Sequence, residues 1–125
     1  MSLKIGMFAQ SDVIVNESNT AAAIGSGSLL VFATPAMIAL MENTAVKSIM
    51  DFLDKTQTTV GISLNIKHLK ASAIGKKITA KAKLTAIDGK KLTFAVEAHD
   101  DKDLIGEGIH ERFIVDSEKF MNKLK

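Results

Sequence analysis

The sequence contains no cysteine, no tryptophan, no tyrosine and a single proline among its 125 residues. Without cysteine, the chain has no disulfide, no thiolate nucleophile and no thiolate metal ligand. The scarcity of aromatic rings argues against a protein that stacks nucleobases. A net charge of +2 is too small to indicate nucleic acid or an anionic membrane as a partner.

Long apolar runs are also missing. No run approaches the length of a membrane span, and no charged, apolar and small-residue segment typical of a signal peptide opens the chain. We therefore expect no membrane partner and a cytoplasmic location. Apolar residues make up 46% of the chain, which argues against disorder. No linker or repeat divides the sequence, so residues 1–125 are expected to form one domain.

A long helix is the clearest predicted element. Thr34-Pro35 is typical of a helix start, with Thr34 as the N-cap and Pro35 at the first helical position, and the helix should run to about Asp54. Most of its circumference is apolar. Its polar residues share an arc of about 100° on the helical wheel: Asn43, Thr44, Lys47, Asp51 and Asp54. A helix this apolar must be covered on most sides.

The rest of the chain supplies the cover. Alternating apolar and polar residues and turn signals predict the following elements: strands at about 8–15, 61–70, 77–87, 92–98 and 104–115, a loop or short helical turn at 16–30, and a short amphipathic helix at 117–125. This order predicts a layered α+β fold in which a five- or six-stranded antiparallel sheet curls around the helix. The open sheet edge favours pairing with a second copy of the chain.

Two polar residues interrupt the apolar pattern. Glu42 lies in the apolar stripe of the helix, and His68 lies on the strand face expected to contact that helix. Either residue could be structural, Glu42 as an ion-pair partner or an edge residue reaching water, and His68 as a satisfied core histidine. On facing elements they could also form an acid–base pair.

Thr34 has a second interpretation besides capping. Its hydroxyl lies two turns before Glu42, near a helix N-terminus where the free amides of Ala36 and Met37 could stabilise developing negative charge. His110 is expected to be structural or interfacial, on the strand face opposite Ile109. The three scattered histidines form no metal-binding motif, so no metal site is predicted.

Three segments carry a family resemblance. They are VFATPAMIALMENTA (31–45), IKHLKASAIG (66–75) and IDGKKLTFAVEAHDDKDLIGEGIHERFIV (87–115). With the patterns A-T-x-x-M-x-x-L-M-E and G-x-G-x-H-E-R, the chain from about Phe8 onward resembles the fluoroacetyl-CoA thioesterase-like branch of the hotdog proteins. The resemblance implies a hotdog fold and a homodimer or a tetramer of dimers. It also implies acyl-CoA thioester hydrolysis in a cleft at the dimer interface, with no cofactor and with Thr34, Glu42 and His68 as the catalytic set.

The sequence departs from that family at two points. Pro35 stands where relatives usually have glycine, so one backbone N–H is missing near Thr34. The segment between the first strand and the helix is shorter than the lid segment of the fluoroacetyl-specialised member. We therefore expect a short or small acyl group, with either comparable hydrolysis of acetyl-CoA and fluoroacetyl-CoA or a preference for a different acyl chain. One alternative is a non-catalytic acyl-CoA-binding or regulatory dimer. Another is a hotdog hydratase, but those enzymes carry an Asp followed five residues later by a His, and no Asp of this sequence has that partner.

Overall fold

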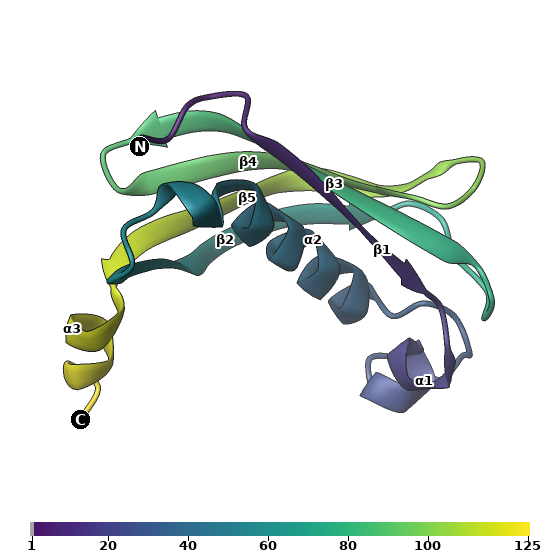
Figure 1. The fold of residues 1–125 in the computed structure, drawn as a ribbon. Helices are drawn as coiled ribbons and strands as arrows, with labels where there is room; N and C mark the ends of the chain where they lie inside the picture. Colours follow the sequence, from purple (N-terminus) through teal and green to yellow (C-terminus); the bar gives the residue numbers. More distant parts are fainter. Residues whose placement is uncertain (1) are drawn as a thin grey trace.

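The helix α2 (Thr34–Ile49) lies against the concave face of a curved antiparallel sheet, as Figure 1 shows for the computed structural model, which describes residues 2–125. Five strands form the sheet, in the order β1-β3-β4-β5-β2. Their bounds are Phe8–Ile14 for β1, Gln57–His68 for β2, Lys77–Asp88 for β3, Lys91–His99 for β4 and Leu104–Asp116 for β5. The predicted α+β hotdog architecture, with one long helix and five antiparallel strands, is confirmed.

The core is formed where α2 crosses β3 and β4. Met37, Met41, Ala45 and Ile49 repeat every four residues along the helix, and all four side chains are fully buried. This repeat places them on one helix face. The alternating buried residues of β3 and β4 complete the core: Ile78, Ala80, Ala82, Leu84, Leu92, Phe94, Val96 and Ala98.

The two ends of α2 differ from the prediction. Ala33, not Thr34, is the N-cap, and it makes no side-chain capping bond. The prediction of Thr34 as the cap is therefore wrong, and its hydroxyl is bonded to His68 instead. The helix ends at Ile49, and a 3-10 turn, η2 (Met50–Phe52), follows it. The predicted end near Asp54 was too late because the turn continues the apolar pattern without continuing the α-helix.

The chain between β1 and α2 fixes the start of the helix. It contains two short helical turns, η1 (Glu17–Asn19) and α1 (Ala21–Ile24), where the sequence predicted a loop or a short helical turn. Phe32 is buried, and its N–H donates to the Ser72 carbonyl at 2.9 Å. The next N–H, of Ala33, donates to the Asn19 carbonyl at 2.9 Å. These bonds hold the first turn of α2 beside the segment that follows β2.

Strand β2 lies at one edge of the sheet. Its register with β5 shifts between Gly61 and Ser63, where a β-bulge interrupts the alternation of the strand. Ile62 and Leu64 remain 51% and 43% exposed. Alternation along this segment predicts both side chains on the face turned toward α2, with His68. That prediction of cover is wrong for Ile62 and Leu64, because α2 contacts β2 at Gly61 and His68 and leaves these two side chains exposed.

The C-terminal helix α3 (Ser117–Asn122) projects away from the sheet in Figure 1. Asp116 caps it by accepting a hydrogen bond from the Lys119 N–H at 3.0 Å. Within residues 2–125, no helix has both the length and the apolar character needed to cross a membrane.

Candidate active site

The first half of the site is a contact between α2 and the end of β2. The Thr34 Oγ1 and His68 Nδ1 atoms are 2.8 Å apart. Thr34 occupies the first helical position, and His68 is the last residue of its strand. In the tautomer that carries its proton on Nε2, the imidazole accepts a hydrogen bond from the threonine hydroxyl. That geometry is the one in which a histidine base activates a hydroxyl nucleophile.

The surroundings of His68 favour its neutral form. Burial lowers the pKa of His68, and the backbone of Lys70 partly opposes this effect. The Nε2 atom is buried and has no hydrogen-bond partner within the described chain. A neutral imidazole with a depressed pKa is competent to accept a proton at neutral pH.

A hollow of about 260 Å³ opens beside this pair. Thr34, His68, Phe32 and Leu69 contribute to its walls. The hollow therefore gives a small molecule access to both the threonine hydroxyl and the imidazole. Lys70 also lines it, but its ammonium group is bonded to the carboxylates of Asp100 and Asp103 at 2.8 Å and 2.6 Å.

The second half of the site surrounds Glu42. Its Oε2 lies 3.5 Å from Nη1 of Arg112 on β5, and the Arg112 side chain is only 9% exposed. Arg112 also donates from Nε to the Thr59 hydroxyl at 2.8 Å and from Nη2 to the Thr59 carbonyl at 3.0 Å. Of the two structural interpretations of Glu42, the ion pair is the one the structure shows.

His110 completes this second cluster. Its ring lies 3.1 Å from Arg112 Nη1 through Nε2 and 2.9 Å from the Ser63 carbonyl through Nδ1. The side chain is fully buried on the inner face of the sheet, whereas Ile109 is exposed. The two side chains lie on opposite faces of β5, as the alternation predicts, and the face of His110 is the covered one. Sequence analysis missed Arg112 altogether, although its two-residue spacing from His110 was the signal that both side chains share one face.

The structure does not bring all three predicted catalytic residues into contact. Thr34 touches His68, and Glu42 touches Arg112, but no hydrogen bond or ion pair of the described residues links Glu42 to the threonine–histidine pair. Thr34 and Glu42 are eight residues apart on α2, so their backbones are separated by about 12 Å along the helix axis. One chain therefore carries two half-sites on the same side of the sheet.

The backbone N–H groups of Ala36 and Met37 are the predicted donors to developing negative charge. The Met37 N–H donates to the Ala33 carbonyl at 3.0 Å, as the first hydrogen bond of the helix. It is therefore not free, and the prediction of a free Met37 amide is wrong. Because Pro35 has no N–H, Ala36 is left as the predicted donor nearest to Thr34.

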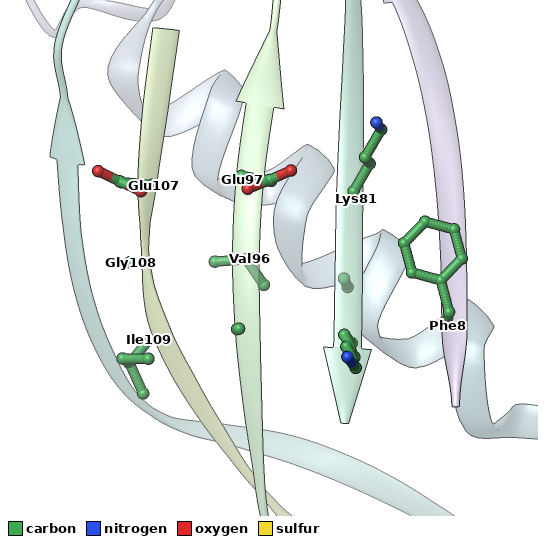
Figure 2. Close-up of a pocket in the computed structure, with 10 residues that line it drawn as sticks. Phe8, Lys81, Val96, Glu97, Glu107, Gly108 and Ile109 are labelled. Atoms are coloured by element: carbon green, nitrogen blue, oxygen red, sulfur yellow. The ribbon is translucent and has the colours of Figure 1, made fainter. Parts of the chain in front are cut away.

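A larger hollow, of about 370 Å³, lies on the opposite, outer face of the sheet. Figure 2 shows Phe8, Lys81, Glu97 and Ile109 around it, with α2 behind the strands. None of the predicted catalytic residues lines this hollow. We place the active site on the α2 side, since there the Thr34 hydroxyl and the His68 imidazole lie within hydrogen-bonding distance beside a hollow. Within residues 2–125, no group of three or more His, Asp or Glu side chains is arranged to hold a metal ion.

Comparison with known proteins gives a consistent result. The profile of the family described as "FlK: Fluoroacetyl-CoA-specific thioesterase" matches residues 15–118. The fluoroacetyl-CoA thioesterase of Streptantibioticus cattleyicolor is 36% identical over 95 residues, which are 76% of this chain and 68% of that protein.

Solved structures show the same relationship. A threonine-to-serine mutant of FlK in complex with acetyl-CoA superposes with a TM-score of 0.92 at 30% identity, covering 98% of this chain and 96% of that chain. A thioesterase superfamily member from Thermus thermophilus, TTHA0967, superposes with a TM-score of 0.89 at 26% identity, covering 97% of this chain and 90% of that chain.

Proposed function

Because the chain belongs to the fluoroacetyl-CoA-specific thioesterase family, FlK, we propose that its two half-sites jointly hydrolyse the thioester of a small acyl-CoA. Family membership makes the chain a thioester hydrolase that acts on acyl-CoA. The finer assignment of roles to residues rests on geometry. The observation that carries it is the 2.8 Å contact between the Thr34 hydroxyl and His68 beside the hollow.

The chemistry of each half-site fits one step of thioester hydrolysis. The carbonyl carbon must be attacked by an oxygen nucleophile, and the CoA thiolate must leave. Thr34 and His68 form a hydroxyl–base pair, in which the imidazole can accept a proton from the hydroxyl and later return it. Glu42 supplies a carboxylate that either orients a water molecule or attacks the carbonyl. The Ala36 N–H, near the N-terminus of α2, is the proposed donor to the developing oxyanion.

The close packing beside Glu42 favours a small acyl group. A methyl group added at Gly61 would lie 3.0 Å from Glu42 Oε2, 3.3 Å from Arg112 Nη1 and 3.4 Å from the His110 ring. Glycine at this position lets β2 pass close to the Glu42–Arg112 pair, and even one added carbon would be crowded there. A long acyl chain would have to displace the Arg112–Glu42 pair, which would leave a buried charge without its partner.

We propose that the half-sites meet across a homodimer. The exposed apolar side chains of Ile62 and Leu64 lie on the open edge formed by β2. A twofold axis near Leu64 would pair two β2 strands in antiparallel fashion and reverse the order of residues along the edge. Glu42, which lies beside Gly61, would then face the Thr34–His68 pair of the second copy.

The cytoplasmic location and the possible pairing of two dimers into a tetramer stay predictions. Light scattering at micromolar concentration tests the assembly and should give at least twice the mass of the 13.4 kDa chain. A monomer under those conditions would contradict a site shared between two copies.

The function itself is tested with a panel of acyl-CoA thioesters, read by the release of free thiol. The panel contains acetyl-CoA, fluoroacetyl-CoA, propionyl-CoA and palmitoyl-CoA. We expect turnover of the short thioesters and little turnover of palmitoyl-CoA. Tight binding of acyl-CoA without any thiol release would instead identify a binding protein, and preferred turnover of palmitoyl-CoA would refute the small acyl pocket.

A further inference from the structure

The β-bulge on β2 has a specific neighbour on β5. Where the register shifts between Gly61 and Ser63, the Ser63 carbonyl is directed at the His110 ring and lies 2.9 Å from Nδ1. A bulge re-aims backbone groups out of the regular ladder. Here it supplies a buried acceptor for a side chain on the inner face of the sheet.

The partners of His110 fix its protonation state. A carbonyl oxygen only accepts hydrogen bonds, so Nδ1 must carry a proton. Arginine only donates, so Nε2, 3.1 Å from Arg112 Nη1, must be unprotonated and accept. His110 is therefore neutral and protonated on Nδ1, and both of its ring nitrogens are satisfied.

The Arg112 guanidinium is held at three points. Two bonds to Thr59 hold its Nε and Nη2, and His110 holds Nη1. Nη1 is also the nitrogen that faces Glu42 Oε2 at 3.5 Å. Thr59 contacts the other two guanidinium nitrogens, Nε and Nη2. His110 therefore determines the position of Arg112 Nη1, the nitrogen that faces Glu42.

From this chain of contacts we infer that His110 is a positioning residue, which uses the Ser63 carbonyl to aim Arg112 at the catalytic Glu42. The inference rests on the proposed function of Glu42. It adds a role for three groups, the bulge, His110 and Arg112, that do not react themselves. Displacement of a reacting carboxylate by a fraction of an ångström changes turnover more than substrate binding.

A purely structural role is the competing explanation. His110 packs near Phe94, with ring centroids 6.3 Å apart and an angle of 31° between the rings. An apolar residue would fill this place without the cost of burying an imidazole. The histidine is better explained by its two hydrogen bonds, and the experiment separates these from its packing.

Two amide variants test the two hydrogen bonds of His110 separately, because each variant keeps one bond and loses the other. The side-chain amide of His110→Asn reaches the position of Nδ1, so it keeps the bond to Ser63 and loses the acceptor for Arg112. The longer side chain of His110→Gln reaches the position of Nε2, so it keeps an acceptor for Arg112 and loses the bond to Ser63. His110→Phe retains the packing on Phe94 and loses both bonds.

We expect His110→Gln, which keeps the acceptor for Arg112 without the Ser63 anchor, to lower kcat by only about threefold to tenfold. His110→Asn and His110→Phe should lower kcat by about tenfold to a hundredfold, the scale of a misplaced reacting group, with KM changed less than about threefold. Thermal unfolding of all three variants identifies any effect that comes from lost stability. Equal kcat for the Asn and Gln variants at equal stability would refute the positioning role.

A second measurement does not depend on activity. A two-bond proton–nitrogen correlation spectrum of the wild-type protein at pH 7.5 should show His110 neutral and protonated on Nδ1. Protonation on Nε2, or a charged ring, would overturn the inference even if the enzyme is active. Failure of the proposed function appears differently, as absence of thiol release by the wild type while the Nδ1 tautomer is observed.

Discussion

Replacement of Glu42 by glutamine tests both the chemistry and the electrostatics of the site. Glutamine keeps the shape of the side chain and removes its charge. If Glu42 were an uncompensated buried charge, this change would leave stability unchanged or raise it. The structure predicts the opposite, because the carboxylate lies 3.5 Å from the buried Arg112 guanidinium.

The size of the effect follows from the geometry. Two unit charges 3.5 Å apart attract by about 5 kcal/mol at an effective dielectric constant of 20, and by about 1 kcal/mol in water. The Glu42 side chain is 35% exposed, so water screens much of this attraction. Arg112 also keeps its bonds to Thr59 and His110 in the variant. We expect Glu42→Gln to lower the free energy of unfolding by about 1–2 kcal/mol.

The same substitution should lower kcat by about a hundredfold or more, as expected for the loss of a positioned acid–base group or nucleophile. Glu111→Gln is a matched control. Glu111 also lies 3.5 Å from a cation, Lys91, but this pair is on the outer face of the sheet. It should lose no more than about 0.5 kcal/mol and leave turnover unchanged. Urea unfolding and thiol release on the same preparations provide both readouts, and unaltered turnover in Glu42→Gln would refute the catalytic role of the carboxylate.

Three further predictions concern the other half-site, pH and specificity. Thr34→Val removes the hydroxyl that contacts His68 and should lower kcat by about tenfold or more. Thr34→Ser keeps a hydroxyl and should retain most of the wild-type kcat. Equal activities of the two variants would show that the hydroxyl is not used. Burial lowers the pKa of both His68 and His110 in the folded chain. Below about pH 6.5 the unfolded chain therefore takes up protons that the folded chain does not. The free energy of unfolding should fall as the pH falls from about 6.5 toward the depressed folded-state pKa values. Thermal unfolding between pH 5 and pH 8 checks this direction, and a stability that rises toward pH 5 would contradict it. For specificity, kcat/KM for acetyl-CoA and fluoroacetyl-CoA should be comparable after correction for the intrinsic reactivity of the two thioesters. The reason is that burial of a few atoms discriminates between substrates by only about 1–3 kcal/mol. A preference of about a thousandfold or more for fluoroacetyl-CoA would show that residues 16–30 close the site.

The sequence predicted the elements that depend on local patterns. The long helix, the five strands and the short turns between β1 and α2 all follow from periodicity and turn residues, and the structure contains them. The contact between Thr34 and His68 did not follow from the pattern, which paired Glu42 with His68 and made Thr34 a helix cap. Only the family resemblance placed Thr34 with His68 in one catalytic set.

The partners of Glu42 could not be derived in the same way. Alternation along β5 defines two faces but does not say which one is covered, and the apolar character of Ile109 and Phe113 does not identify it. Both are exposed, whereas His110 and Arg112 lie inside. The bulge on β2 that accommodates His110 is a tertiary feature, since it exists only in the pairing of β2 with β5. Buried polar networks of this kind depend on the whole fold and carry no local periodicity.

The most direct test of the shared site is complementation between two inactive variants. Glu42→Gln and His68→Ala are each purified, mixed in equal amounts under conditions that allow the subunits to exchange, and assayed for release of thiol from the best small acyl-CoA. If Glu42 of one copy works with Thr34 and His68 of the other, each mixed dimer has one intact site. Random exchange makes half of the dimers mixed, so the mixture should recover about a quarter of wild-type activity. Subunit exchange confirmed by mass spectrometry with no recovered activity would contradict a site shared between two copies.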